Sequence, residues 1–281
     1  MPDSVSSASS PLDFVLVFGH PIYALAIAAL GIETVVCAHT SVFLYPLPAH
    51  PRFPAISVLP WLPPIPWLAY SFGIVMALLG FGLLPRRTLR PSALALGSLL
   101  FLAALILDVP RNAALPGSIG LRTLVFEPLS LACIAWLLPG ADQIPAGLER
   151  LARYLLAISF IIFGVDHFLA LRPIAALIPG WIPWHVFWIA FFGAGFIATG
   201  ISLASNILVR WSTACIGLMY MIWVLTLHLP SVLGTYVMAG RNNHVSLMSS
   251  FLIAVSLWGG PWALARSVRQ TALTSSPSAP S

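Results

Sequence analysis

The chain has little charge and no lysine. Only 7% of its 281 residues are charged, all 13 of its basic side chains other than histidine are arginine, and 59% of its residues are hydrophobic. A protein folded in water needs more polar surface than this, so the composition excludes a soluble globular protein. Clustered cations are also scarce, which argues against a nucleic-acid partner. We therefore expect an integral membrane protein whose first partner is the lipid bilayer.

Cysteine is scarce as well. Cys37, Cys133 and Cys215 each lie in an apolar run, and no two of them form a C-x-x-C pair. This excludes a disulfide framework and a dithiol redox motif. The serine-rich head lacks the cationic segment of a cleaved signal peptide, so the first span should remain as an anchor. We expect a disordered head at 1–17 and a disordered tail at 264–281.

Long apolar runs take the place of charge. Windows of about 19 residues predict eight transmembrane helices, at 18–44, 64–84, 91–109, 119–139, 148–171, 184–206, 208–229 and 241–263. The runs do not alternate, which excludes a membrane β-barrel. Eight arginines fall on the side of the termini and five on the other. The sequence thus predicts cytoplasmic termini in a bacterial-type inner membrane.

The two halves of the sequence share a pattern. Four short motifs recur at separations of 117 to 120 residues, namely Ile65-Pro66-Trp67 with Ile182-Pro183-Trp184, Arg90 with Arg210, Val109-Pro110 with Leu229-Pro230, and Arg122 with Arg241. Repeated units with an even number of spans insert in the same orientation. We therefore predict an all-α protein with two parallel four-helix repeats, 18–140 and 141–263.

Several of these motifs also resemble a known family. Arg153 opens a span that ends in Gly-Val-Asp-His-Phe at 164–168, a proline-rich turn follows at 177–184, and the next span contains Gly193 and Gly200. This arrangement resembles the DoxX-like superfamily of small four-helix membrane proteins. The resemblance covers 148–263 well and the first half in outline, where Thr34 replaces His167. It implies an accessory or redox-linked membrane subunit, with a quinone as the candidate cofactor and other membrane subunits as partners.

Polar side chains within or beside the spans are the candidate functional residues, because one charge at mid-helix costs about 2.5–3.5 kcal/mol on insertion scales. The predicted orientation gathers them toward the outer side. They are Glu33, Arg122, Asp166, His167, Trp181, Trp184, His228, Arg241, Asn243 and His244. A buried carboxylate needs a partner, so we expect Glu33 to pair with Arg122, and Asp166 with Arg241.

Two interpretations of this cluster remain open. In the first, the ion pairs only hold the first span of each repeat to its last. In the second, they form the floor of a polar pocket at the outer face. Asp166 and His167 should point about 100° apart on their helix, so neither can orient the other. No two of His167, His228 and His244 have the spacing of metal ligands on a helix, and we expect no metal.

Three classes of function follow from these patterns. The first is a membrane subunit, not itself an enzyme, that binds a small hydrophobic or anionic partner such as a quinone at its outer face. The second is a small-solute transporter, which the duplication favours. The third is a structural or assembly factor. The inner halves of the spans are almost wholly apolar, which argues against a channel or an ion-driven pump.

Overall fold

The chain is helical throughout the part that the structure describes. The computed structural model describes residues 11–36, 66–114, 116–139, 143–235 and 244–274. No strand occurs within these ranges. Backbone N–H and C=O groups inside a bilayer must bond within the chain, and a helix satisfies this for a single apolar run. The long helices are α2 (Gly19–Val36), α3 (Pro66–Gly82), α4 (Arg86–Ala103), α6 (Ile119–Leu137), α7 (Ala146–Leu169), α9 (His185–Ser205), α10 (Val209–Trp223) and α12 (His244–Thr274).

Seven stretches of the described chain are helical, long and apolar enough to cross a membrane, as expected for a multi-pass membrane protein. The predicted span at 64–84 forms a shorter apolar helix, α3. The predicted span at 18–44 is helical as far as Val36, and its remainder lies outside the described residues. Proline precedes α4 and α7 at Pro85 and Pro145. At the start of α6, Oγ of Ser118 accepts a hydrogen bond from the backbone N–H of Leu121, a typical N-cap.

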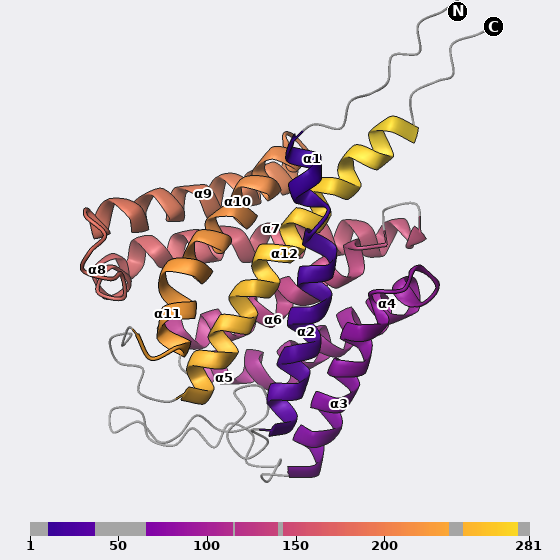
Figure 1. Cartoon of the computed structure of the whole chain (residues 1–281), viewed down its shortest axis with the longest axis horizontal. Helices are drawn as coiled ribbons and strands as arrows, with labels where there is room; N and C mark the ends of the chain where they lie inside the picture. The colour runs from indigo at the N-terminus through magenta and orange to yellow at the C-terminus, as the bar shows by residue number, and fades with distance from the viewer. Residues whose placement is uncertain (1–10, 37–65, 115, 140–142, 236–243, 275–281) are drawn as a thin grey trace, which may run out of the picture.

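The eight long helices, labelled in Figure 1, contact one another in a closed ring. In order of contact, the ring runs through α2, α3, α4, α6, α7, α9, α10 and α12, and α12 packs again on α2. Helices α6 and α12 also contact each other across the ring. The ring places the last helix of each half beside the first helix of the other half, since α6 lies against α7 and α12 lies against α2.

Glycines allow the closest helix contacts. A Cβ atom at Gly31 of α2 would lie 2.4 Å from the backbone N of Ala77 in α3. Likewise, a Cβ atom at Gly164 of α7 would lie 2.5 Å from the carbonyl oxygen of Gly193 in α9. Backbones that approach this closely leave no room for a side chain, as is common where membrane helices cross. These contacts fix α2 on α3 and α7 on α9.

Two tryptophans hold neighbouring helices together, and each makes the same two kinds of contact. Nε1 of Trp136 donates to the carbonyl oxygen of Leu94 at 3.3 Å, and its indole ring lies against Gly97. Nε1 of Trp262 donates to the carbonyl oxygen of Ala214 at 3.0 Å, and its ring lies against Gly217. Each bond satisfies an indole N–H that would be costly to bury alone. The first fixes α6 on α4 and the second fixes α12 on α10.

Two helices widen into a π-helical turn before a proline. The π turns are η1 (Ala104–Asp108) after α4 and η3 (Val224–His228) after α10. The short helices α5 (Val109–Ala114) and α11 (Leu229–Val232) follow, with Pro110 and Pro230 as their second residues. Proline has no N–H and crowds the preceding turn, and a wider turn accommodates it. The wider turns lie at the end of the bundle opposite the termini.

Both termini depart from the expected disorder. The short helix α1 (Pro11–Leu16) lies within the predicted disordered head, and α12 continues to Thr274, beyond its predicted end at 263. Packing explains the difference, because Leu16 is buried against Ala214, Trp262 and Ala265. Asp13 adds an ion pair with Arg210, with Oδ1 2.8 Å from Nη2. The described ends of the chain therefore lie together at one end of the bundle.

A candidate ligand cavity

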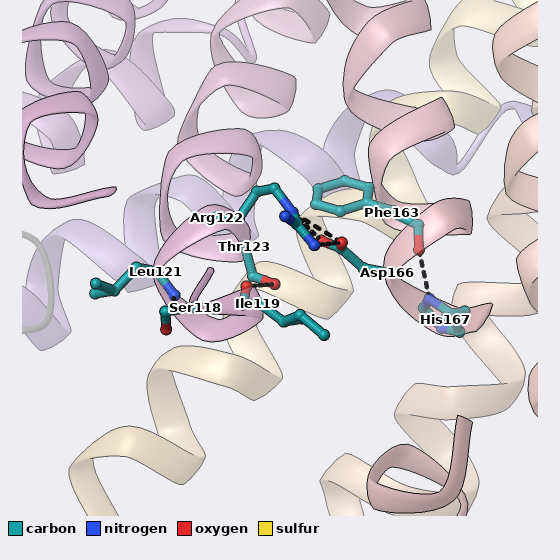
Figure 2. A network of polar contacts seen from close by, with 8 residues as sticks. All are labelled: Ser118, Ile119, Leu121, Arg122, Thr123, Phe163, Asp166 and His167. Atoms are coloured by element: carbon teal, nitrogen blue, oxygen red, sulfur yellow. Dashed lines mark hydrogen bonds and ion pairs between the residues drawn. The ribbon is translucent and has the colours of Figure 1, made fainter. Parts of the chain in front are cut away.

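Arg122 and Asp166 form an ion pair between α6 and α7 (Figure 2). Nε of Arg122 donates to Oδ1 and Oδ2 of Asp166 at 2.8 and 3.2 Å, and Nη2 also donates to Oδ1. The Asp166 carboxylate is buried, while Arg122 is partly exposed. Two donors on one carboxylate make a charge-assisted and geometrically specific contact. The pair therefore joins the last helix of the first half to the first helix of the second half.

This pairing corrects the predicted one. We expected Arg122 to pair with Glu33 in the same half, but α6 presents Arg122 to α7. Oε1 of Glu33 instead accepts a hydrogen bond from Oγ of Ser249 in α12, at 2.8 Å. Both contacts cross between halves because the ring places α6 beside α7 and α12 beside α2. The predicted partner of Asp166, Arg241, lies outside the described residues.

His167 points toward α9 and away from the ion pair, as helix geometry predicts. Its Nδ1 lies 2.7 Å from the carbonyl oxygen of Phe163, one turn earlier in α7. Its ring lies against Phe196 of α9, with 5.1 Å between ring centroids. The two adjacent side chains, Asp166 and His167, therefore contact different helices.

A cavity of about 240 Å³ lies beside these residues, within the second half of the chain and α6. Its wall is contributed by α6, α7, α9, α10 with η3, and α12, and by the segment around α8 (Leu171–Ala175). Its polar lining residues are Thr123, Glu127, Asp166, His167, Tyr220, His228 and Ser250. The structure thus brings together three of the predicted site residues, Asp166, His167 and His228.

Aromatic rings form a continuous part of the cavity wall. Phe163 and Phe196 meet edge to face with centroids 5.8 Å apart, and Phe196 meets Tyr220 in the same way at 5.6 Å. Trp223 lines the cavity one turn further along α10. Aromatic walls with a few polar groups are typical of sites for small organic ligands.

The two predicted tryptophans are not part of this wall. Trp181 and Trp184 are 72% and 76% exposed and lie in the turn between α8 and α9. Trp184 has a left-handed backbone conformation, with φ of 58°, directly before α9. The aliphatic residue Ile178 takes the buried position in this turn. Neither tryptophan is among the residues that line this cavity, and their exposure suits a membrane–water interface.

The remaining predicted residues are Arg241, Asn243, His244 and Glu33. Asn243, like Arg241, lies outside the described residues, and His244 is the first residue of the helix. Glu33 is buried beside Ser249 and is not among the cavity-lining residues.

Sequence reasoning missed most of the cavity wall. The lining residues Thr123, Glu127, Phe196, Tyr220 and Trp223 are not among the predicted site residues. Tyr220, Trp223 and Leu227 are three to four residues apart, so they share one helix face. Tyr220, an aromatic residue with a hydroxyl group on this face, is the sequence feature that could have indicated the cavity wall.

The chemistry of the wall limits its ligands. In the described part of the chain, no three His, Cys, Asp or Glu side chains are placed to hold a metal ion. The Arg122 guanidinium is already bound to Asp166 through two nitrogens, and the lining contains a further carboxyl group, Glu127. This combination does not favour an anionic ligand.

Known proteins give no further guidance. Comparison with family models, curated proteins and solved structures found no match. The candidate site therefore rests on its own geometry.

Proposed function

We propose that this protein binds a small, mainly apolar organic ligand in the cavity between α6, α7, α9, α10 and α12. The observation that carries the proposal is the gathering of acidic, histidine and hydroxyl side chains around one cavity inside a largely apolar bundle. Polar side chains inside a membrane are costly, and those that persist commonly mark a binding site or a pathway. The cavity has the aromatic walls and few polar groups of a ligand site.

We further propose that the bundle is a duplicated unit with eight spans, α2 to α6 and α7 to α12. The tryptophan contacts support this, because Gly97 and Gly217 are 120 residues apart, as are Leu94 and Ala214. The π turns η1 and η3 begin at the same separation. The contacts from Arg122 to Asp166 and from Ser249 to Glu33 then become equivalent, so Ser249 takes the place of a second arginine.

The duplication also locates the ligand site in the second unit. At the spacing of 120 residues, the lining residues Phe196, Tyr220 and Trp223 correspond to Met76, Leu100 and Ala103. These three counterparts are buried in the first unit. A four-helix unit thus packs with aliphatic residues at these positions, and the aromatic and phenolic lining of the second unit reflects function rather than folding.

A quinone fits the cavity's chemistry. Its flat ring can stack against aromatic side chains, and its carbonyl oxygens can accept hydrogen bonds from a hydroxyl group such as that of Tyr220. The resemblance to the DoxX-like superfamily points in the same direction. On this proposal, the chain is an accessory or redox-linked membrane subunit whose cavity opens on the outer face, opposite cytoplasmic termini.

The proposal is tested by calorimetric titration of the purified protein with duroquinone and with durene, which has the same shape without the carbonyl oxygens. We expect duroquinone to bind more tightly. Tyr220→Leu, which installs the first unit's residue, should weaken duroquinone binding roughly three- to tenfold, as expected for one hydrogen bond. Tyr154→Leu makes the same change at an exposed position on α7 and should have no effect. Equal binding to the wild type and to Tyr220→Leu would contradict the proposal.

A further inference from the structure

A second hollow lies on the outside of the bundle between α9 and α10. This groove, of about 200 Å³, is lined on α9 and α10 largely by small side chains, with larger apolar ones at its edges. The small lining residues are Gly195, Ala198, Thr199, Ser212 and Cys215. Exposed apolar residues such as Phe191 border it, so it faces the hydrocarbon of the bilayer.

The groove is apolar despite its hydroxyl groups. Oγ1 of Thr199 donates to the carbonyl oxygen of Gly195 at 2.9 Å. Oγ of Ser212 lies 2.8 Å from Oγ of Ser202 and 3.1 Å from the carbonyl oxygen of Val209. Hydroxyl groups bonded in this way to their own or a neighbouring helix leave a surface that suits hydrocarbon. The groove therefore fits an alkyl chain better than a polar ligand.

One layer of aromatic rings separates the groove from the cavity. Phe192 lines the groove and Trp223 lines the cavity, and their ring centroids are 5.1 Å apart. The neighbouring contact between Phe196 and Tyr220 continues the same layer. Both hollows thus flank the contact between α9 and α10.

The two hollows follow each other along α10, where residues 220–228 line the cavity and residues 212–219 line the groove. On α9 they overlap, because Phe196 of the cavity falls within the 191–199 stretch of the groove. The cavity also reaches α8, which lies at the end of the bundle opposite the described termini. Along α9 alone, the groove extends over residues 191–199, which span about 12 Å at 1.5 Å per residue. A polar head in the cavity would therefore place its chain deeper in the membrane.

The groove also distinguishes the second unit from the first. At the spacing of 120 residues, Gly195, Ala198 and Thr199 correspond to Val75, Leu78 and Leu79. The first unit thus carries bulky side chains where the second has small ones. The linings of both hollows thus include residues that depart from the first unit, which supports one ligand for the two.

We propose that the cavity and the groove together bind a single-chain amphiphile, which enters from the bilayer between α9 and α10. Its compact hydrogen-bonding head occupies the cavity, and its alkyl chain lies in the groove. This inference rests on the proposed ligand cavity and adds the ligand's class and its route. The ring layer of Phe192 and Trp223 parts to admit the head and then packs around the start of the chain.

The test uses 4-alkylphenols and the full-length protein in lipid nanodiscs. The probe is a 4-dodecylphenol that carries a diazirine near the end of its chain, and the competitor is 4-ethylphenol, which has the same head. After illumination, mass spectrometry should locate crosslinks within residues 191–199 and 212–219. The competitor at ten times its Kd should reduce these crosslinks roughly tenfold, because about one cavity in ten remains free. Crosslinks from probe dissolved in the bilayer should not respond to the competitor.

Substitutions that install the first unit's residues in the second unit make the test more specific. The double variant Gly195→Val with Ala198→Leu fills the groove. It should lose the crosslinks that 4-ethylphenol prevents in the wild type, while its affinity for 4-ethylphenol, measured by calorimetry, stays unchanged. Side-chain atoms can be added at Gly195 because no heavy atom lies within 4 Å of a Cβ atom there. The control is Ala194→Ile, which installs the first unit's residue at an exposed position outside the groove and should retain the crosslinks.

Two results would overturn the inference, and they are distinguishable. If 4-ethylphenol binds, and binds more weakly to Tyr220→Leu, but leaves the crosslinks unchanged, the groove does not hold the chain and the cavity proposal stands. If 4-ethylphenol does not bind to the wild-type protein, the cavity proposal fails together with the inference.

Discussion

The contact between Arg122 and Asp166 shows how one residue pair can specify an arrangement of helices. Either charge alone would be costly inside the bundle. Two nitrogens of Arg122 donate hydrogen bonds to the carboxylate of Asp166, so each charge has a partner. At the other junction of the ring, the contact between Ser249 of α12 and Glu33 of α2 is one hydrogen bond in place of an ion pair. The two junctions of the ring are thus similar in position and different in chemistry.

A double-mutant cycle tests whether this ion pair is structural. Arg122→Gln should lower stability by about 3–5 kcal/mol, because it leaves the buried Asp166 carboxylate unpaired, and Asp166→Asn should lower it less, because Arg122 is partly exposed. The double variant should recover much of the loss. The measurements are the midpoint of thermal unfolding in detergent and the folded yield by size-exclusion chromatography. Additive losses in the double variant would show that the two side chains are not coupled.

At the scale of helices, close approach depends on particular glycines. Gly164 sits where α7 crosses α9, and its missing side chain lets the two backbones meet. Gly195, in contrast, faces open space beside the groove. Both glycines lie inside helices, so any difference between them comes from packing and not from helix propensity.

Matched alanine substitutions separate these two effects. Gly164→Ala should destabilise the protein by about 1–3 kcal/mol, the usual cost of overpacking, since the new Cβ atom meets backbone. Gly195→Ala should be neutral or stabilising by up to about 1 kcal/mol through helix propensity. Thermal unfolding of the two variants in the same detergent provides the comparison. Similar losses at both positions would contradict the helix contact.

The sequence indicates these elements better than it indicates their contacts. Long apolar runs predict membrane-crossing helices because a bilayer leaves few alternatives for them. The predicted pair of Glu33 and Arg122 was wrong because it assumed contacts within each half, whereas ring closure places α6 beside α7. The offset of 119 residues between Arg122 and Arg241 also suggested an equivalence, while the structure places Ser249 opposite Glu33. Neither neighbour relations nor register can be obtained from hydropathy.

At the scale of the whole molecule, the described ends of the chain share one end of the bundle, and the cavity lies toward the other. The groove lies between them on the lipid-facing side of α9 and α10. This arrangement places the polar lining residues of the cavity away from the described termini, where Asp13 and Arg210 form their ion pair. On the proposal made above, the site is loaded from the bilayer through the groove.

Reporter fusions test the orientation of the bundle. A reporter that works only in the cytoplasm should be active when it is fused after Ser281. A reporter that works only outside the cytoplasm should be active when it is inserted after Ala176, beyond α8. The excess of arginine on the side of the termini is the physical reason. A fusion after Leu84, between α3 and α4, serves as a second cytoplasmic marker. The reverse result at all three sites would place the cavity on the cytoplasmic side.

Because the ring is closed, the packing of the helices does not depend on which helix comes first along the chain. Helix α1 packs on α12, so the two described ends already lie together, while α6 and α7 are held by their own ion pair. A circular permutant that joins the old ends and opens the chain between α6 and α7 would keep every helix beside its present neighbours. The polypeptide would then begin with the unit that contains the cavity, and the bundle itself would be unchanged.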